Sequence, residues 1–278
     1  MTATEVQRAA LSEFDGLVGE LTDAGVDVII IEDTQQPRTP DSIFPNNWVS
    51  FHENGAIILY PMFAPNRRRE RRRDMLGVLR EKGFEIRSVI DLTDSEDEGR
   101  FLEGTGSLVL DRENRIAYAG LSLRTDASLV QEWANLTGYE TVVFNAVRKV
   151  EGLWQPIYHT NVMMSVADKL AIICADSIRD QNERKQVLSK LEATGKKPIL
   201  LSERQTARFA GNMLQVGNRE DENIMVMSTQ AYNCLTRDQI ATIEESNRIV
   251  HSPLDVIETL SGGSARCMIA EVFLPSQR

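Results

Sequence analysis

Cysteine, histidine and aromatic residues are all scarce in this sequence. Its 278 residues include three cysteines, at positions 174, 234 and 267, and three histidines, and aromatic residues make up 6%. Three cysteines without a C-x-x-C pair argue against a disulfide framework and against a structural zinc site. A zinc deaminase would need a P-C-x-x-C pair, which the sequence lacks. We therefore expect no metal or organic cofactor, and a reducing cytoplasm as the compartment.

Long apolar segments and an excess of positive charge are absent as well. No stretch approaches the roughly 18 apolar residues of a membrane span, and the acidic, amphipathic segment 1–16 does not look like a signal peptide. A net charge of −10 and a pI of about 5.0 make nucleic acid and anionic membranes poor partners. With 42% hydrophobic residues, the chain can form an ample core in one large domain or two small ones.

The chain contains a repeat with a period of about 50 residues. Each copy has a polar or small residue, an apolar run, a turn, a second apolar run and the start of a helix, as at 106–126, 161–180 and 212–236. A repeat of this length indicates stacked or radial supersecondary units. Five such units around one axis would make a single catalytic domain, 1–278, joined by the N-terminal helix 4–23.

Within each copy, the apolar periodicity predicts a strand–strand–helix–strand unit. The chain ends on a predicted strand, 268–274, which has to pair with early sequence if a ring of repeats closes. The other predicted strands are 26–31, 48–51, 56–60, 84–89, 107–110, 115–119, 139–144, 162–166, 170–174, 198–201, 213–216, 224–227 and 256–259, and the other predicted helices are 66–82, 126–136, 178–194 and 237–249.

Four side chains follow the period of the repeat. Asn47, Glu103 and His159 are separated by steps of 56 residues, and Cys267 lies 108 residues further on, nearly two more steps. Equivalent positions in radial repeats lie near one axis. A thiol, an imidazole and a carboxylate at one centre are the parts of an enzyme that works through a nucleophile.

Cys267 is the candidate nucleophile. It follows the glycine-rich segment 261–266 and precedes an apolar strand, and a thiol on a tight loop can be exposed and meet backbone N–H groups. Cys174 and Cys234 lie inside apolar runs, where a free cysteine behaves as a small buried hydrophobe.

His159 and Glu103 are the candidate partners of this nucleophile. An imidazole can serve as both base and acid near neutral pH, and His159 is the only histidine in step with the repeat. Glu103 is expected to orient the ring and favour its charged form. The alternatives are a structural histidine and a loop carboxylate on the surface.

Four motifs stand in order along the chain: FLEGTGSLVL (101–110), GLSLRTD (120–126), YHTN (158–161) and SARCMIAEVFLP (264–275). They resemble the guanidino-group-modifying (pentein) superfamily, most closely its citrulline-utilisation hydrolase (citrulline ureidase) branch, and the resemblance covers the chain from about residue 26. It implies an α/β fold, namely a five-bladed α/β propeller of pseudo-fivefold ββαβ repeats. It also implies a Cys–His–Glu triad, here Cys267, His159 and Glu103.

The resemblance also implies contacts to the amino-acid end of a substrate. Asp41 in PDSIF matches an aspartate that contacts this end, here its ammonium group. Arg67 in APNRRRE and Arg124 in GLSLRTD match arginines that bind its carboxylate. For Arg67, the alternative is one charge on a solvated basic helix within the run 67–73.

Two asparagines depart from what the resemblance implies. Arginine-processing relatives carry an aspartate at the position of Asn47, and the deiminases carry another at the position of Asn161, although one asparagine is also what a dihydrolase, which processes arginine through a ureido intermediate, would need. A guanidinium offers only donors, whereas a ureido group also offers a carbonyl acceptor. A carboxylate facing that carbonyl would leave two acceptors unsatisfied, at about 1–3 kcal/mol, but an amide can donate to it. The pair therefore favours a neutral ureido substrate, although Asn46-Asn47 could be turn chemistry alone.

The expected activity is hydrolysis of the ureido group of L-citrulline to L-ornithine, carbon dioxide and ammonia by a cysteine hydrolase. Because a neutral substrate cannot help to form the thiolate, we expect Cys267 to depend on the His159 imidazolium, with Arg266 as a second source of charge. Open alternatives are an arginine dihydrolase or deiminase, an amidino transferase, and a non-catalytic ribosome-binding propeller. Oligomeric state, and whether the acidic loop 91–99 is a lid, are also open.

Overall fold

Four three-stranded sheets of one topology repeat along the chain in the computed structural model, which describes residues 1–34 and 36–276. In each sheet, two strands form an antiparallel hairpin and the last strand pairs in parallel with the middle one. The sheets are β1 (Val49–Phe51), β2 (Ala56–Leu59) and β3 (Ser88–Asp91); β4 (Leu108–Asp111), β5 (Ile116–Gly120) and β6 (Glu140–Phe144); β9 (Met164–Val166), β10 (Leu170–Ile173) and β11 (Lys197–Leu200); and β12 (Leu214–Gly217), β13 (Asn223–Ser228) and β14 (Arg248–Ser252).

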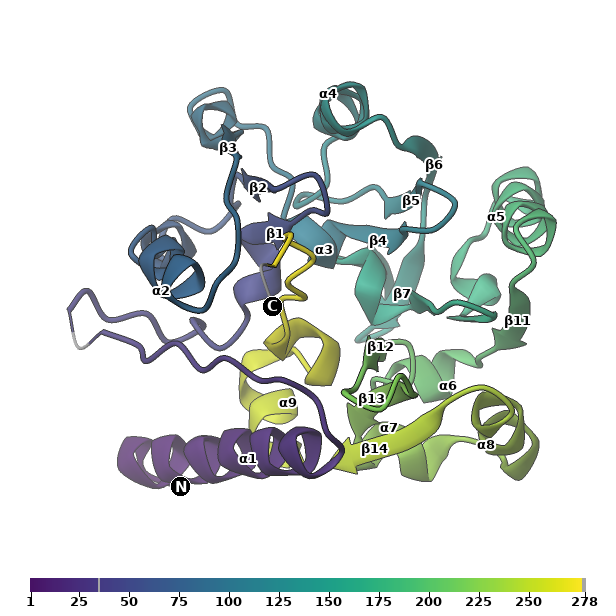
Figure 1. Cartoon of the computed structure of the whole chain (residues 1–278). Coiled ribbons are helices and arrows are strands. Elements are labelled where there is room, and N and C mark those ends of the chain that lie inside the picture. The colour runs from purple at the N-terminus through teal and green to yellow at the C-terminus, as the bar shows by residue number, and fades with distance from the viewer. Residues whose placement is uncertain (35, 277–278) are drawn as a thin grey trace.

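A helix joins the middle strand of each sheet to its parallel partner, because parallel strands need a crossover connection. These helices are α2 (Met75–Glu81), α4 (Ala127–Thr137), α5 (Gln181–Ala193) and α8 (Arg237–Glu244), and they lie on the outside of the ring of sheets (Figure 1). Side chains of Asp126, Asp180 and Thr236 accept hydrogen bonds from backbone N–H groups at the starts of the last three. The predicted strand–strand–helix–strand order is thus confirmed for the first three repeats. In the fourth, the parallel strand is β14 and not the predicted 256–259, and it starts where the predicted helix 237–249 was expected to end.

The predicted fifth blade is absent as a sheet from the described part of the chain, so five complete blades are not confirmed. Residues 26–31 and 268–274, predicted as strands, belong to no strand. This sector instead holds α1 (Ala3–Asp23), α9 (Asp255–Ser261) and the turn η6 (Ala265–Met268) (Figure 1). The end of the chain does meet early sequence, through an isolated bridge from Phe84 to Ser276.

Two further predictions were wrong for reasons that lie outside the segment concerned. Residues 256–259 form part of α9 because the Glu13 carboxylate of α1 accepts hydrogen bonds from the backbone N–H groups of Val256 and Ile257 at 2.8 and 3.0 Å. The predicted helix 66–82 is broken at Arg71, which is extended and whose guanidinium binds Glu96.

Shorter elements complete the chain. The hairpin of β7 (Val147–Val150) and β8 (Leu153–Pro156) was not predicted, and it turns at Glu151 and Gly152, both with positive φ. The single turns are η1 (Pro45–Asn47), η2 (Arg67–Glu70), η3 (Thr93–Glu96), α3 (Gly104–Ser107), η4 (Thr160–Val162), η5 (Ala175–Ser177), α6 (Glu203–Thr206) and α7 (Thr229–Cys234).

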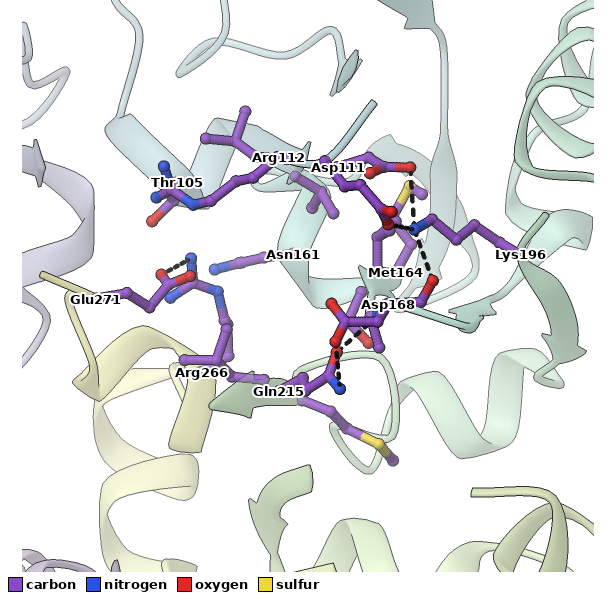
Figure 2. Close-up of a pocket in the computed structure, with 18 of the residues that line it drawn as sticks. Thr105, Asp111, Arg112, Asn161, Met164, Asp168, Lys196, Gln215, Arg266 and Glu271 are labelled. Carbon is purple, nitrogen blue, oxygen red and sulfur yellow. Dashed lines mark hydrogen bonds and ion pairs between the residues drawn. The ribbon is translucent and has the colours of Figure 1, made fainter. Parts of the chain in front are cut away.

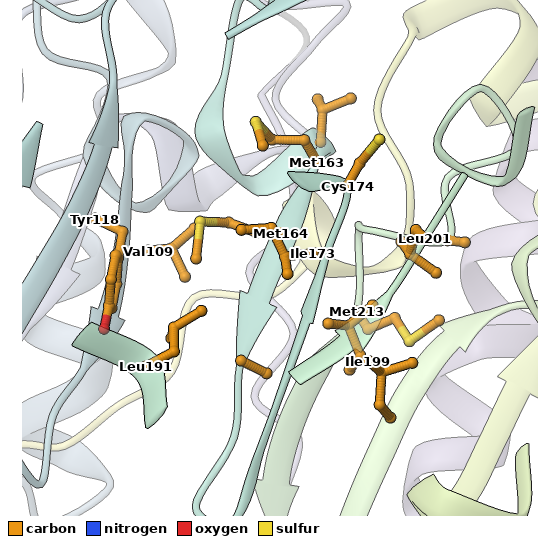
Figure 3. Packing of buried hydrophobic residues seen from close by; sticks show 14 of the residues in the cluster. Val109, Tyr118, Met163, Met164, Ile173, Cys174, Leu191, Ile199, Leu201 and Met213 are labelled. Carbon is orange, nitrogen blue, oxygen red and sulfur yellow. The ribbon is translucent and has the colours of Figure 1, made fainter. Parts of the chain in front are cut away.

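The largest apolar cluster joins the second, third and fourth of these sheets. Figure 3 shows Met164 of β9 next to Val109 of β4, and Met213, which precedes β12, next to Ile199 of β11. Cys174 is fully buried in this cluster, as expected of a small hydrophobe. Among the described helices, none is long and apolar enough to cross a membrane.

Candidate active site

The candidate residues lie on short turns. Asn47 is in η1, Glu103 and His159 directly precede α3 and η4, and each of these turns leads into the first strand of a sheet. Cys267 lies in η6, the last helical turn of the described chain. The turn α3 contacts both η1 and η4, and η1 also contacts η6. These contacts bring Asn47, Glu103, His159 and Cys267 towards one centre, as their spacing predicts. All four are buried.

Glu103 and His159 form the strongest polar contact at this centre. Oε2 of Glu103 lies 2.7 Å from Nε2 of His159. Burial opposes a charge on Glu103, but the hydrogen bond from His159 and the positive charges of His159, when it is protonated, and of Arg124 and Arg67 outweigh it and lower the pKa of Glu103 to about 2. Burial, together with the charges of Arg124 and Arg67, lowers the pKa of His159 below its usual value, against the hydrogen bond and charge of Glu103, which raise it. The pair is therefore an ionised carboxylate that accepts from Nε2–H of a neutral imidazole.

The Glu103 carboxylate is held from two further sides. Its Oε1 accepts from the backbone N–H of Phe63 at 2.9 Å. Its Oε2 also lies 3.2 Å from Nη1 of Arg124, which is half-buried. With these contacts Glu103 is a buried anchor, and the alternative of a surface carboxylate is wrong.

The sulfur of Cys267 has two amides as hydrogen-bond partners, not the imidazole. Nδ2 of Asn212 lies 3.3 Å from Sγ, and Nδ2 of Asn161 lies 3.5 Å from it. Arg266 points elsewhere, because its guanidinium donates to the carbonyl of Ile269 and pairs with Glu271 at 2.9 Å. The expectation that the thiolate depends on a charged His159 and on Arg266 thus does not fit this arrangement.

Asn212 is a residue that the sequence reasoning missed. Its Oδ1 accepts from the backbone N–H of Arg266 at 3.1 Å, which turns its NH2 group towards Sγ and the carbonyl of Asn161. The signal was present, because Asn212 precedes β12 as Asn47 precedes β1 and as Asn161 precedes β9. The repeat therefore places an amide at three equivalent positions.

The Asn47 side chain is fixed by Arg67. Its Oδ1 accepts from Nη1 of Arg67 at 2.9 Å, and Arg67 in turn forms a two-pronged ion pair with Glu70, at 3.1 Å from Nε and 2.9 Å from Nη2. All three side chains are buried. Within the described residues, Nδ2 of Asn47 has no hydrogen-bond partner. The Asn47 side chain is thus held by a tertiary contact and not only within its own turn.

Gly106 shows that Asn47 and His159 face the same small space. A Cβ atom at residue 106 would lie 2.4 Å from Nδ2 of Asn47 and 3.0 Å from Nδ1 of His159. Only glycine fits between these groups. The free donor of Asn47 and the second nitrogen of His159 are therefore neighbours.

The arginine run 67–73 is not a solvated basic helix. Arg68 and Arg71 both pair with Glu96, and Arg73 pairs with Asp91. The acidic loop 91–99 thus binds the segment that carries Arg67. It acts as an anchor for this segment.

The remaining predicted residues lie at the edge of the centre. Asp41 is half-buried, and its backbone carbonyl oxygen lies 3.4 Å from Nη2 of Arg67. Arg124 lies over the ring of Tyr158, as does Arg148 of β7, at 5.4 and 5.1 Å from the ring centre. Burial, followed by the negative charge of a Cys267 thiolate, raises the pKa of Tyr158 to about 12. Arg148 was not predicted because it lies on the unpredicted hairpin, and Tyr158, which adjoins His159, was not singled out.

A polar cavity of about 130 Å³ lies on the other side of Asn161 (Figure 2). Its walls include Thr105, Asn161 and Arg266, so Asn161, which contacts the sulfur of Cys267, also borders this cavity. Lys196 is buried beside this cavity, and its Nζ lies 3.4 Å from Oδ2 of Asp111 in an ion pair. In residues 1–34 and 36–276, no group of three or more His, Cys, Asp or Glu side chains is placed to hold a metal ion.

One protein family matches nearly the whole chain. A family model described as N,N dimethylarginine dimethylhydrolase, eukaryotic, matches residues 1–274. No curated protein sequence matches the chain.

Several solved structures share its fold. Apo ArgZ, an arginine dihydrolase from the ornithine-ammonia cycle in cyanobacteria, is 19% identical with a TM-score of 0.73 over 97% of this chain and 38% of that chain. The N-terminal domain of ArgZ bound to product is 19% identical with a TM-score of 0.72 over 97% of this chain and 89% of that chain. A dimethylarginine dimethylaminohydrolase with an S-methyl-L-thiocitrulline adduct is 18% identical with a TM-score of 0.66 over 94% of this chain and 87% of that chain. The chain thus spans about 38% of the full ArgZ chain, and likeness at these identities establishes the α/β fold alone.

Proposed function

Since the chain belongs to the N,N dimethylarginine dimethylhydrolase family, we propose that it is a cysteine hydrolase of this family whose substrate is the ureido group of L-citrulline. The proposed products are L-ornithine, carbon dioxide and ammonia, as in the citrulline ureidase branch. Residues 1–278 would act as one catalytic domain, a five-bladed propeller in which α1, α9 and the C-terminal segment stand in for the fifth blade.

The orientation of Asn47 is the observation that carries this proposal. Arg67 can only donate, so it accepts no proton from Asn47 and must face Oδ1, which leaves the NH2 group of Asn47 directed elsewhere. A buried donor without a partner needs an acceptor from the substrate. A ureido carbonyl is such an acceptor, and a guanidinium, which has only donors, is not.

The charges of the site support the same choice. Three neutral amides border the space between the sulfur and the imidazole: Asn161 and Asn212 lie beside the sulfur, and Asn47 faces Nδ1 of His159. The Glu103 and Glu70 carboxylates are already bound to His159 and Arg67. A buried guanidinium would find little compensating negative charge here, whereas a neutral ureido group needs none.

The proposed reaction has two steps. Sγ of Cys267 attacks the ureido carbon, and its proton passes to His159, which is neutral and can accept it. His159 then protonates the departing NH2 group, so that ammonia leaves and a thiocarbamate on Cys267 remains. In the second step, His159 takes a proton from water, whose oxygen attacks the same carbon. The thiol is released, and the resulting carbamate loses carbon dioxide to give ornithine.

The other proposed contacts hold the two ends of the substrate. Asn161, beside the sulfur, would orient the ureido group together with Asn47. Asp41 would bind the α-ammonium group, and Arg67 and Arg124 would supply positive charge for the α-carboxylate. Both arginines already act on the Glu103–His159 pair electrostatically, which supports their position near the substrate.

A second candidate is hydrolysis of arginine itself, through a ureido intermediate or as far as citrulline. This second activity is favoured by the fold that the chain shares with ArgZ, an arginine dihydrolase. Ammonia release from citrulline and from arginine at equal concentration distinguishes the two. We expect citrulline to be preferred, with no release by Cys267→Ser. A tenfold or greater preference for arginine would reverse the assignment.

A further inference from the structure

We infer that Arg67 is a positioning residue that sets the choice between ureido and guanidino groups by fixing the side chain of Asn47. This inference rests on the proposed function, and it changes the main role of Arg67 from a ligand of the substrate carboxylate to a support for Asn47. It starts from the hydrogen bond between Nη1 of Arg67 and Oδ1 of Asn47, which is 2.9 Å long and fully buried.

The donors of Arg67 are largely occupied by the protein. Its Nε–H and one Nη2–H bind the two oxygens of Glu70. The other Nη2–H faces the carbonyls of Asp41 and Phe44, each at 3.4 Å, and one Nη1–H binds Asn47. A guanidinium has five N–H groups, so one Nη1–H is left. A two-pronged contact with a substrate carboxylate needs two adjacent donors, and Arg67 cannot supply them.

Arg67 itself is held rigidly. Glu70 is one turn away on the same 3-10 turn, both residues are buried, and the ring of Phe44 lies 6.0 Å from the guanidinium carbon. A fixed guanidinium can fix what it touches. If the Asn47 amide were turned by 180°, its NH2 group would face the N–H groups of Arg67, which has no acceptor. The Asn47 side chain therefore has one favourable orientation.

That orientation decides what the site can bind. With Oδ1 held by Arg67, Asn47 offers a donor towards the space that it shares with His159. Without Arg67, the amide could turn and offer Oδ1 instead, which would accept an N–H of a guanidinium as readily as one of a ureido group. Loss of Arg67 should therefore reduce selectivity, not only affinity.

The test uses two ligands with the same amino-acid end. Dissociation constants of citrulline and arginine are measured by calorimetry with Cys267→Ser protein, alone and combined with Arg67→Met and Glu70→Gln, a pair that removes the buried charges together. Because both ligands carry the same carboxylate, loss of a carboxylate ligand weakens both equally. Loss of the Asn47 support should instead shift the arginine-to-citrulline ratio towards arginine by about tenfold.

Two matched variants complete the design. Arg67→Lys keeps a group that can only donate and should restore most of the ratio. Arg69→Met changes an exposed arginine of the same turn and should leave it unchanged. With Cys267 intact, Arg67→Met/Glu70→Gln should lower kcat for citrulline, whereas a lost carboxylate ligand would raise KM alone.

The outcomes separate this inference from the proposed function. An unchanged ratio together with an unchanged kcat overturns the positioning role, whichever ligand the starting protein prefers. Stronger binding of arginine by the starting Cys267→Ser protein overturns the ureido assignment. In that case, a further shift towards arginine in the Arg67 variant would still support the positioning role.

Discussion

The side-chain amide of Asn212 lies 3.3 Å from the sulfur of Cys267 and can only donate to it. Its Oδ1 is bound by the backbone N–H of Arg266, so the amide cannot turn. Donors directed at sulfur stabilise the thiolate more than the thiol. We therefore expect Asn212 to supply part of the thiolate stabilisation that the sequence assigned to a charged His159.

Replacing Asn212 with aspartate should make Cys267 less reactive. The substitution keeps the shape of the side chain but puts a negative charge beside the sulfur, which disfavours the thiolate. We expect the rate of alkylation by iodoacetamide at pH 7 to fall about tenfold or more. The measurement follows labelling of Cys267 by mass spectrometry in protein with Cys174→Ser and Cys234→Ser.

His159→Ala serves as the comparison in the same assay. Because His159 is neutral and is not a hydrogen-bond partner of the sulfur, its loss should change the alkylation rate by less than about threefold. If His159→Ala slows alkylation as strongly as Asn212→Asp, the imidazolium does support the thiolate and the assignment to the amides is wrong.

Glu103→Gln should lower activity while the protein remains folded. A glutamine can still occupy the site but lacks the charge that favours protonation of His159 when it takes up the thiol proton. General acid–base catalysis is worth roughly 10²–10⁴-fold, and we expect kcat/KM for citrulline to fall within this range. Glu98→Gln, a change to an exposed carboxylate, is the control and should have wild-type activity. Wild-type activity in Glu103→Gln would remove Glu103 from the mechanism.

Some of this site was accessible from the sequence, and the reason is physical. Repeats with the same local pattern form the same turn–strand unit, so equivalent positions such as Glu103 and His159 had to converge once the repeat was identified. Features set by remote partners were not accessible. Nothing near Val256 indicates that the Glu13 carboxylate binds the backbone N–H groups at the start of its helix.

His52 should make the protein less stable in mild acid. Burial, aided by the charge of Arg112, lowers the pKa of His52 from 6.5 to about 4, and its Nε2 lies 2.8 Å from Oγ of Ser50. In the unfolded chain His52 takes up a proton near pH 6.5, whereas in the folded protein it does so only near pH 4. Stability is therefore full above pH 6.5 and is lost as pH falls towards 4, by about 3 kcal/mol in total.

The variant His52→Gln isolates this contribution, because glutamine keeps a polar group near Ser50 but does not titrate. Urea unfolding at pH 7 and pH 4 gives the free energies. Between pH 7 and pH 4, the free energy of unfolding of the wild-type protein should fall by about 3 kcal/mol more than that of the variant. Equal losses in both proteins would show that His52 is protonated in the folded state.

Glu96 should be needed for both stability and catalysis, because it holds the segment that leads to Arg67. Its Oε1 accepts from the backbone N–H of Met62 at 2.7 Å, and its carboxylate pairs with Arg68 and Arg71, all from a position that is nearly buried. Glu96→Ala would leave these donors without an acceptor, so we expect a loss of about 2 kcal/mol or more in the free energy of unfolding.

Glu96→Ala should also reduce kcat for citrulline, since the neighbouring N–H of Phe63 orients Glu103 and the same segment carries Arg67. Asp97→Asn changes the adjacent exposed carboxylate and should alter neither quantity. If the acidic loop were a lid that moves with each turnover, weakening its ion pairs would instead free it. Glu96→Ala would then raise KM or speed product release while the unfolding free energy changed little. Urea unfolding and steady-state kinetics on the two variants decide between an anchor and a lid.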